Sequence, residues 1–301
     1  MNLSVVSGPW SVAEERRFPD CNGPRTTDNG PLTIMPTISP HSVIDPKASL
    51  AQDVEVGPFC LIGPDVIIGA GTRILSHAVV TGHTTLGANN IVHPHCVLGG
   101  PPQDRKYKGA PTRLEIGDNN LFREGVTIHI GTEKGGGITR IGSGNFFMVN
   151  VHAGHDVQVG NNCVLANNCM LGGHVICGDN VNMMGGVAIH HLVTVGEFAY
   201  IGGYSRIHHD VPPFCKIDGA DVVRTLNAKG LKMNGVSEID IDALEDAHRT
   251  LFGREKPLAV AMAQFDMNNG VNPLVKRLIE FLERRTSSRH GRYQESLRAK
   301  I

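Results

Sequence analysis

An apolar residue recurs at every sixth position through most of the chain. The first series is unbroken and consists of Ile44, Leu50, Val56, Ile62, Ile68, Ile74, Val80, Leu86, Val92 and Leu98. The same phase returns at Ile116, Phe122 and Ile128, slips by one residue, and continues at Ile141, Phe147, Ala153, Val159, Leu165, Leu171, Cys177, Met183, Ile189, Val195, Ile201 and Ile207. A period of six fits neither an α-helical turn nor the two-residue alternation of a strand. It is typical of a chain that makes a short strand, turns a corner and repeats.

Three such hexads would close one triangular coil with the apolar side chains pointing inward. Successive coils would stack about 4.8 Å apart through parallel-sheet hydrogen bonds. Residues 41–211 then correspond to roughly nine coils. We therefore predict a parallel β-helix, whose handedness the period does not reveal.

The repeat is interrupted twice. Residues 99–113 read GGPPQDRKYKGAPTR and residues 131–137 read GTEKGGG, so turn-forming and charged residues replace the hexad there. In a solenoid, such insertions loop out from one corner and often build the binding site. A neutral surface insertion is the alternative.

Beyond DVPPF at 210–214 the period disappears. Amphipathic helices are expected near 240–252, 257–268 and 273–285, and Ser237 to Asp240 offers a start that resembles a capping box. We therefore expect three regions, namely a disordered extension over 1–37, a β-helix over 38–215 and an α-helical domain with a basic tail over 216–301. A transit peptide at the N-terminus is disfavoured because that segment contains acidic residues.

The composition narrows the class of protein. The chain has 36 glycines among 301 residues, 5% aromatic residues and 19% charged residues, which suits short strands and tight turns and disfavours disorder. A net charge of -1 offers no case for nucleic-acid binding. Seven cysteines without a CxxC pair are expected to be free thiols in a reducing compartment. No run reaches the roughly 18 apolar residues of a membrane span, so we expect a cytoplasmic protein.

Histidine is frequent, at 15 residues, and one segment brings two histidines beside an aspartate, namely His152, His155 and Asp156. The core positions Ala153 and Leu171 are equivalent and lie one coil apart. The residues that follow them, His155 and His174, should therefore be neighbours within about one inter-strand spacing.

The next coil adds His190 and His191, which would extend a column of stacked imidazoles. A histidine is the usual general base because its ordinary pKa of about 6.5 leaves much of it neutral at pH 7. Such a column beside an insertion favours a catalytic site over structural histidines. Three neutral imidazoles could also hold zinc.

Seven segments occur in the order VGPFCLIGP, SHAVVTGHTTLG, PPQDRKYKGAPTRLEIG, REGVTIHIGT, VNVHAGHD, LANNCMLGGHV and GGYSRIHHDVPPF. With them, over roughly residues 38–285, the chain resembles the UDP-N-acetylglucosamine O-acyltransferases that open lipid A biosynthesis. The resemblance implies a left-handed β-helix and a homotrimer with sites between subunits. It also implies transfer of an (R)-3-hydroxyacyl group from acyl carrier protein to the 3-hydroxyl of UDP-N-acetylglucosamine, without cofactor, metal or acyl-enzyme.

The resemblance further assigns roles to single residues. His155 matches the general base, Asp156 its orienting partner, and the amide of Gly173 the donor to the thioester oxyanion. Residues that match substrate-binding positions are His152, His174, His129, Gln103, Asp104, Lys106, His190, His191 and Asn227. Gly203 matches the position that limits acyl length, and a glycine there predicts a long chain of about fourteen carbons.

The chain departs from the family around the nucleotide. Lys229 replaces an acid, Met233 and Asn234 stand where phosphate-contacting arginines are expected, and His191 replaces a glutamine. A lysine would not reproduce the bidentate fork of an arginine. A basic C-terminal region suits docking of an acidic carrier protein, and its residues are Lys276, Arg277, Arg284, Arg285, Arg289, Arg292, Arg298 and Lys300.

Other classes of protein remain open. A γ-type carbonic anhydrase would use the histidines to bind zinc between subunits, and a non-catalytic β-solenoid scaffold would not use them at all. The later N-acyltransferase of the same pathway would need an N-terminal uridine-binding domain, for which about 35 unpatterned residues are too few. The 99–113 insertion favours the O-acyltransferase, and a scaffold leaves the pairing of His155 with His174 unexplained.

Overall fold

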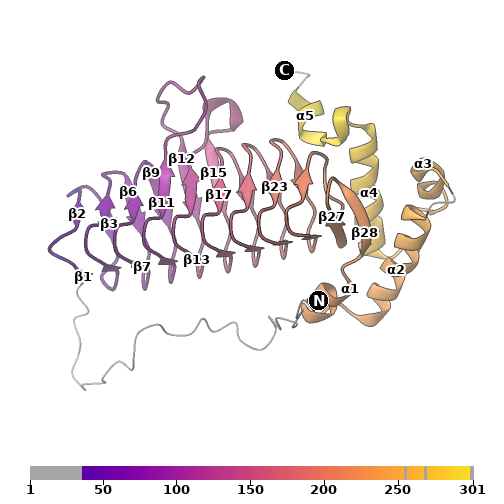
Figure 1. Cartoon of the computed structure of the whole chain (residues 1–301), viewed down its shortest axis with the longest axis horizontal. Helices are drawn as coiled ribbons and strands as arrows, with labels where there is room; N and C mark the ends of the chain where they lie inside the picture. The colour runs from indigo at the N-terminus through magenta and orange to yellow at the C-terminus, as the bar shows by residue number, and fades with distance from the viewer. Residues whose placement is uncertain (1–35, 254–255, 268–269, 299–301) are drawn as a thin grey trace, which may run out of the picture.

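The chain winds into a three-sided parallel β-helix with helices packed at its C-terminal end (Figure 1). The computed structural model describes residues 36–253, 256–267 and 270–298, so the expected extension over 1–37 lies almost entirely outside the described residues. Each coil contributes one short strand to each of three sheets, which we name A, B and C. This architecture confirms the predicted parallel β-helix.

Sheet A consists of β1 (Thr37–Ile38), β4 (Glu55–Val56), β7 (Arg73–Ile74), β10 (Ile91–Val92), β13 (Leu121–Phe122), β16 (Phe146–Phe147), β19 (Val164–Leu165), β22 (Asn182–Met183), β25 (Tyr200–Ile201), β27 (Cys215–Asp218) and β28 (Val222–Leu226). Sheet B consists of β2 (Val43–Ile44), β5 (Leu61–Ile62), β8 (Val79–Val80), β11 (Val97–Gly100), β14 (Thr127–His129), β17 (His152–Ala153), β20 (Met170–Leu171), β23 (Ala188–Ile189) and β26 (Arg206–Ile207). Sheet C consists of β3 (Ser49–Leu50), β6 (Val66–Ile68), β9 (His83–Leu86), β12 (Arg113–Ile116), β15 (Ile138–Ile141), β18 (Gln158–Val159), β21 (Ile176–Cys177) and β24 (Thr194–Val195).

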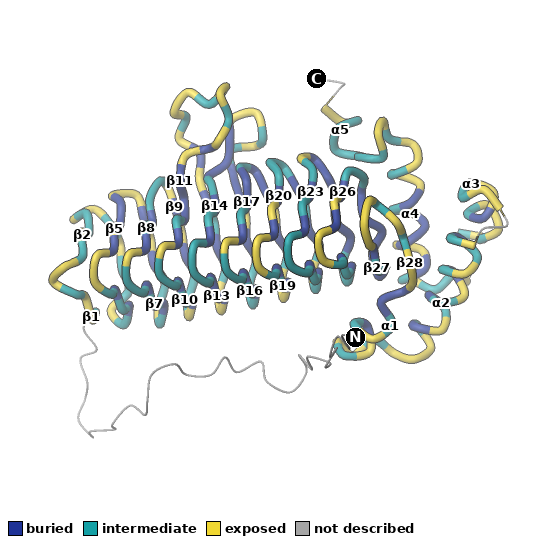
Figure 2. The backbone as a smooth tube through the Cα atoms, in the orientation of Figure 1, coloured by how far each residue is buried: buried dark blue, intermediate teal, exposed yellow. Residues whose placement is uncertain are grey.

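The hexad residues form the core inside the three sheets, as their period predicted. Leu165 and Leu171 are fully buried, and Phe122 stacks over Phe147 with ring centroids 5.2 Å apart. Figure 2 shows the resulting alternation of buried and exposed backbone along each coil. The six cysteines among the described residues are buried free thiols, as expected.

Both insertions leave the helix at the same corner, where a strand of sheet B turns into the next strand of sheet C. We call this the BC corner; the AB and CA corners are defined in the same way. The insertion at 99–113 follows β11 and precedes β12, and the one at 131–137 follows β14 and precedes β15. The second contains a short 3-10 helix, η1 (Glu133–Gly135).

The pairing registers explain why the hexad phase survives one insertion and slips at the other. Leu86 pairs with Ile116 across the first insertion, whereas Ile116 pairs with Ile141 across the second. The first insertion therefore adds twelve residues to a coil of eighteen, which is a multiple of six and preserves the phase. The second adds seven residues and shifts the phase by one.

The C-terminal end closes the helix with two strands and several short helices. β27 adds a parallel strand to sheet A, and β28 pairs antiparallel with it. The sheet thus continues to Leu226, past the boundary expected at residue 215, because an antiparallel return strand carries no hexad. The helices are α1 (Ala228–Met233), α2 (Glu238–Phe252), α3 (Leu258–Met262), α4 (Pro273–Ser287), η2 (Arg289–Gly291) and α5 (Tyr293–Arg298).

The three helices expected from the sequence are present, although α3 is shorter than the expected 257–268. At the start of α2, the hydroxyl of Ser237 accepts the N–H of Asp240, which confirms the predicted cap. Among the described residues, no helix has both the length and the apolar character that crossing a bilayer requires.

Candidate active site

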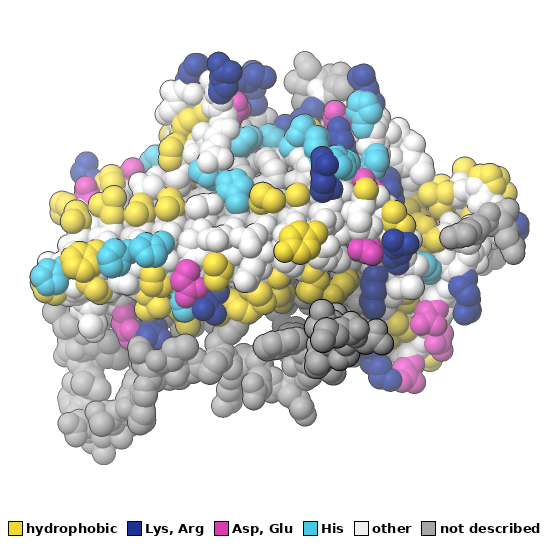
Figure 3. All heavy atoms as spheres, viewed as in Figure 1, with side chains coloured by type: hydrophobic (Ala, Val, Ile, Leu, Met, Phe, Trp, Pro, Cys, Tyr) yellow, Lys and Arg dark blue, Asp and Glu magenta, His cyan; other side chains and the backbone are white. Residues whose placement is uncertain are grey.

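The histidines and both insertions meet at the BC corner. His155 follows β17, and His174 follows β20, one coil further along the same sheet. Figure 3 shows histidine side chains gathered on the face below the large insertion and beside the C-terminal helices. Several predicted site residues therefore share one side of the molecule.

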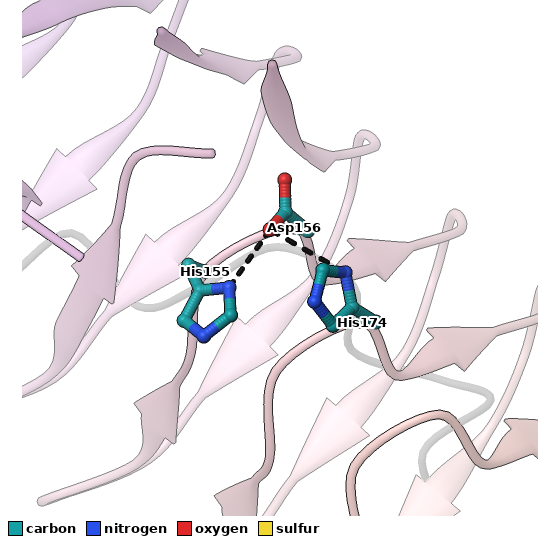
Figure 4. Close-up of side chains that lie close together, drawn as sticks. All are labelled: His155, Asp156 and His174. Carbon is teal, nitrogen blue, oxygen red and sulfur yellow. Dashed lines mark hydrogen bonds and ion pairs between the residues drawn. The ribbon is translucent and has the colours of Figure 1, made fainter. Parts of the chain in front are cut away.

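Asp156 lies between two imidazoles (Figure 4). Its Oδ2 is 2.7 Å from Nδ1 of His155 and 3.4 Å from Nδ1 of His174. The two rings meet edge to face, with centroids 4.9 Å apart. Because Ala153 pairs with Leu171, this closeness confirms the coil-to-coil stacking that the hexad predicted.

The second insertion holds the carboxylate in place. The backbone N–H of Thr132 donates to Oδ1 of Asp156 at 2.8 Å, and the Thr132 hydroxyl donates to Oδ2 at 2.6 Å. Below it, the backbone N–H of Asp156 donates to the hydroxyl of Thr139. Burial alone would raise the pKa of Asp156, but the hydrogen bonds from His155 and Thr132 outweigh burial and hold that pKa below its usual value.

An ionised Asp156 determines the tautomer of its partner. A carboxylate only accepts hydrogen bonds, so Nδ1 of His155 must carry the proton that it shares with Asp156. The other ring nitrogen, Nε2, then has a free lone pair. An imidazole in this state, oriented by a buried carboxylate, has the form that general-base chemistry requires.

His174 is held as a neutral imidazole. Its pKa is lowered to about 4, chiefly by burial, while Asp156 acts in the opposite direction. The nitrogens of His155 and His174 and the Asp156 carboxylate come within 4.8 Å of one another, a spacing that a metal ion could also use. However, Oδ2 of Asp156 already accepts hydrogen bonds from Thr132 and His155. We call these three hydrogen-bonded residues the relay.

Gly173 brings its backbone against the base. A Cβ at this position would lie 2.8 Å from both Cε1 and Nε2 of the His155 ring, closer than side chains tolerate. Among the described residues, none accepts a hydrogen bond from the N–H of Gly173. That N–H is therefore free to donate to a bound group.

A second pair of imidazoles lies on the preceding coils. The rings of His129 and His152 are 5.3 Å apart, and Nδ1 of His152 is 2.8 Å from the Thr127 hydroxyl. Nδ1 of His129 is 2.6 Å from the carbonyl oxygen of Pro101, which ties this pair to the first insertion. Burial lowers the pKa of His152, so this ring also stays neutral.

The remaining residues of the BC corner lie around these pairs. Gln103 and Lys106 are exposed on the first insertion, whose turn is held by the Lys106 N–H donating to the carboxylate of Asp104 at 2.9 Å. On the coil after His174, the rings of His190 and His191 are 4.0 Å apart.

Two predicted residues do not join this corner. Asn227 is 4% exposed, and its Nδ2 donates to the carbonyl of Phe198 at the CA corner. Gly203 lies between β25 and β26 and therefore at the AB corner. Within one chain, neither residue is placed beside His155.

Other residues at the site were missed by the sequence analysis. Thr132 and Gly135 come from the second insertion, and a Cβ on Gly135 would lie 2.0 Å from Cγ of Asp156. Arg298, assigned only to a basic surface, donates to Nδ1 of His174 at 2.8 Å. The hexad gives no information on contacts that an insertion or a tail makes. For Thr132 and Gly135, the only signal in the sequence was that their segment, GTEKGGG, precedes the coil that carries His155.

Two family models match parts of the chain. Residues 138–173 match a model described as bacterial transferase hexapeptide (six repeats). Residues 210–292 match a model described as UDP N-acetylglucosamine O-acyltransferase, domain 2. The second match covers the end of the β-helix and helices α1 to α4.

Curated relatives extend the match over most of the chain. An acyl-[acyl-carrier-protein]--UDP-N-acetylglucosamine O-acyltransferase from Xanthomonas euvesicatoria is 43% identical over 251 residues, covering 82% of this chain and 95% of the relative. The chain belongs to the UDP-N-acetylglucosamine O-acyltransferase family. A second member, from Syntrophobacter fumaroxidans, is 45% identical over 217 residues, covering 71% of this chain and 84% of its own.

Solved structures of UDP-N-acetylglucosamine acyltransferases have the same fold. The enzyme from Campylobacter jejuni is 34% identical with a TM-score of 0.78, covering 84% of this chain and 98% of its own. The enzyme from Arabidopsis is 31% identical with a TM-score of 0.73, with the same coverage. The expected left-handed β-helix with C-terminal helices is thereby confirmed. Family membership also favours the acyltransferase over the carbonic anhydrase and the scaffold.

Proposed function

We propose that this chain transfers an (R)-3-hydroxyacyl group from acyl carrier protein to the 3-hydroxyl of UDP-N-acetylglucosamine, the first step of lipid A biosynthesis, with His155 as general base. The activity follows from the family, in which the curated relatives carry the name acyl-[acyl-carrier-protein]--UDP-N-acetylglucosamine O-acyltransferase. The observation that carries the mechanism is the 2.7 Å contact between Nδ1 of His155 and the buried, ionised carboxylate of Asp156.

The relay suits direct attack of the sugar on the thioester. Nε2 of His155 takes the proton of the 3-hydroxyl as the sugar oxygen forms its bond to the thioester carbon. The backbone N–H of Gly173 donates to the carbonyl oxygen as that oxygen becomes negative. When the carbon–sulfur bond breaks, the proton held by His155 passes to the sulfur, and phosphopantetheine leaves as a thiol. No covalent bond to the enzyme forms.

The polar groups around the relay suit a sugar nucleotide. We propose that His152, His174 and His129 position the sugar and the acyl chain, and that Gln103, Asp104 and Lys106 contact them from the first insertion. His190 and His191, one coil beyond His174, would contact the nucleotide. Asn227 and Gly203 would contribute from another subunit.

A homotrimer with sites between subunits would bring these distant residues to His155. The AB corner carries a column of stacked rings, with centroids 5.0 Å to 5.7 Å apart, formed by His41, Phe59, His77 and His95. The adjoining sheet B exposes a row of large apolar side chains, which includes Val43, Leu61 and Met170. A second copy of the chain would cover such an apolar surface. We expect sedimentation to give about three times the 32.4 kDa chain mass.

The carrier protein would dock on basic residues that make no ion pair with other described residues. Arg277 is paired with Glu197 at 2.6 Å, and Arg292 contacts Glu295. Lys276 and Arg289 are exposed on the helical end and remain suited to an acidic partner. We propose that the enzyme acts in the cytoplasm, where acyl carrier protein supplies the donor.

The test is incubation of the full chain with UDP-N-acetylglucosamine and a panel of 3-hydroxyacyl carrier proteins, followed by mass spectrometry. The expected product is the sugar nucleotide with one O-linked 3-hydroxyacyl chain. Failure to form such a product with any chain length would overturn the proposal. Stoichiometric zinc together with hydration of carbon dioxide would favour the carbonic anhydrase instead.

A further inference from the structure

The last helix lies on the active-site corner although it follows the family match. That match ends at residue 292, and α5 begins at Tyr293. The backbone N–H of Tyr293 donates to Oδ2 of Asp210 at 2.8 Å, and Nε2 of Gln294 donates to the carbonyl of His174 at 3.1 Å. Figure 1 shows α5 on the same side of the β-helix as the large insertion. A segment outside the family match thus contacts the coil that carries His174.

Arg298 at the end of α5 determines the tautomer of His174. Its guanidinium is 2.8 Å from Nδ1 of that ring. A guanidinium has only donors, so Nδ1 must be the unprotonated nitrogen. A neutral His174 then carries its proton on Nε2.

In this tautomer, His174 does not compete with His155 for Oδ2 of Asp156. Oδ2 of Asp156 lies 2.6 Å from the Thr132 hydroxyl and 2.7 Å from Nδ1 of His155. Nδ1 of His174 is the third neighbour, at 3.4 Å. A carboxylate oxygen offers about two lone-pair directions, and Thr132 and His155 already use both. If Nδ1 of His174 carried a proton, it would compete with His155 for the same oxygen.

We propose that Arg298 is a positioning residue, which occupies Nδ1 of His174 and so reserves Asp156 for His155. With Arg298 in place, Nε2 of His174 is an N–H donor that can hold the substrate. Without it, the His174 ring can donate to Asp156, and His155 loses the partner that orients its base nitrogen. This inference rests on the proposed function, because it assigns His155 and Asp156 their roles.

The other charged and titratable groups around His174 agree with this role. Burial is the main cause of the lowered pKa of His174, and Asp156 alone acts against it. The groups that lower it further are Arg298, His155 and His191. Arg298 therefore supports the neutral ring both by its charge and by its hydrogen bond.

The test compares Arg298→Gln and Arg298→Lys with wild type in the full-length enzyme. We expect Arg298→Gln to lower kcat about tenfold, because a hydrogen bond from a charged donor is lost. KM for UDP-N-acetylglucosamine should change less than kcat, since the substitution weakens at most one hydrogen bond from His174 to the substrate. Arg298→Lys should restore most of kcat because an ammonium can make the same single donation.

The matched control is Arg249→Gln, which removes the same charge from α2. Arg249 is exposed, and its guanidinium contacts Asp246 of the same helix. We expect this variant to keep wild-type kcat and KM. A chain that ends after Tyr293 should resemble Arg298→Gln, and its melting curve would show that the β-helix remains folded.

Three results would overturn the inference while leaving the proposed function intact. An unchanged kcat in Arg298→Gln would show that His174 does not need the arginine. A raised KM with unchanged kcat would make Arg298 a ligand for substrate phosphates. An increase in activity would make the tail an inhibitor. A wild-type enzyme that forms no acylated sugar would overturn both the proposed function and this inference.

Discussion

At the scale of single residues, the site depends on which nitrogen of each imidazole carries the proton. Asp156 is 3% exposed and accepts three hydrogen bonds, from Thr132 and from His155. These bonds keep it ionised and require the proton of His155 to sit on Nδ1. Nε2 of His155 then lies on the side of the ring that approaches the backbone of Gly173, and in the proposed mechanism the buried carboxylate orients this nitrogen for proton transfer.

Replacing the base tests this arrangement most directly. We expect His155→Ala to lower kcat by about 10²- to 10⁴-fold, because the sugar hydroxyl would attack without losing its proton to a base. Steady-state assay of the acylated sugar nucleotide measures the effect. His248→Ala, which removes a histidine from α2 next to Phe252, should keep wild-type kcat. Full activity of His155→Ala would remove His155 from the mechanism.

The neutral state of His174 makes stability depend on pH. Its pKa falls from an ordinary 6.5 to about 4 on folding, so between these values the unfolded chain binds a proton that the folded chain does not. Stability is therefore lost as the pH falls from about 6.5 to about 4. Between pH 7 and pH 5, wild type should lose about 2 kcal/mol more free energy of unfolding than His174→Gln. Urea titrations at equal protein concentration measure this; equal losses would contradict it.

At the scale of elements, the two insertions complete a corner that the coils alone leave open. The second insertion supplies Thr132 and places η1 directly over Asp156, and the first is linked to His129 through Pro101. The β-helix provides fixed spacing between coils, and the insertions provide the polar groups that the hexad core does not contain. The geometry of this corner thus depends on a rigid repeat and on two insertions into it.

Adding one methyl group to η1 should disturb the relay without unfolding the protein. In Gly135→Ala, the new Cβ would overlap the Asp156 carboxylate, so the insertion or the carboxylate must move. We expect a fall in kcat of about a hundredfold, since small displacements at a catalytic group are costly. The melting temperature should change little, because η1 buries no residue. Lys134→Ala, on the exposed side of the same turn, is the matched control, and equal kcat values for the two variants would contradict this expectation.

At the scale of the whole molecule, one chain separates residues that the proposed reaction needs together. His155 is at the BC corner and Gly203 at the AB corner, on different edges of the triangular helix. The rigid coil cannot bring two of its edges together, whereas a neighbouring copy can place its AB corner against the BC corner of the first. The exposed apolar row on sheet B suits such packing.

Gly203→Met tests both the acyl-length role and the packing. A Cβ at this position would meet only ordinary contacts, 3.4 Å from the carbonyl oxygen of Gly185 and 3.8 Å from Met184, so the variant should fold. We expect the preferred acyl chain to shorten, with a two-carbon mismatch worth about fifteenfold at about 0.8 kcal/mol per methylene. Competition among carrier proteins of different chain length, read by mass spectrometry, measures the shift, and an unchanged profile would contradict it.

Mixing subunits distinguishes action between copies from action within one chain. Chains with His155→Ala retain Gly203, and chains with Gly203→Met retain His155. If the two residues act from different copies, mixed trimers should again accept long acyl chains. If they act within one chain, the mixture should produce only the short-chain profile of Gly203→Met.

The pattern of apolar residues predicts the coil, its core and the neighbours within one sheet. An apolar residue at every sixth position is a local property, and repeating it stacks each coil on the one before, so Ala153 over Leu171 and His155 beside His174 followed directly. The contributions of the insertions and the tail depend instead on contacts between segments that are far apart in the chain. Thr132 reaches Asp156 over 24 residues and Arg298 reaches His174 over 124. Neither segment follows the period, so only folding brings them to the corner.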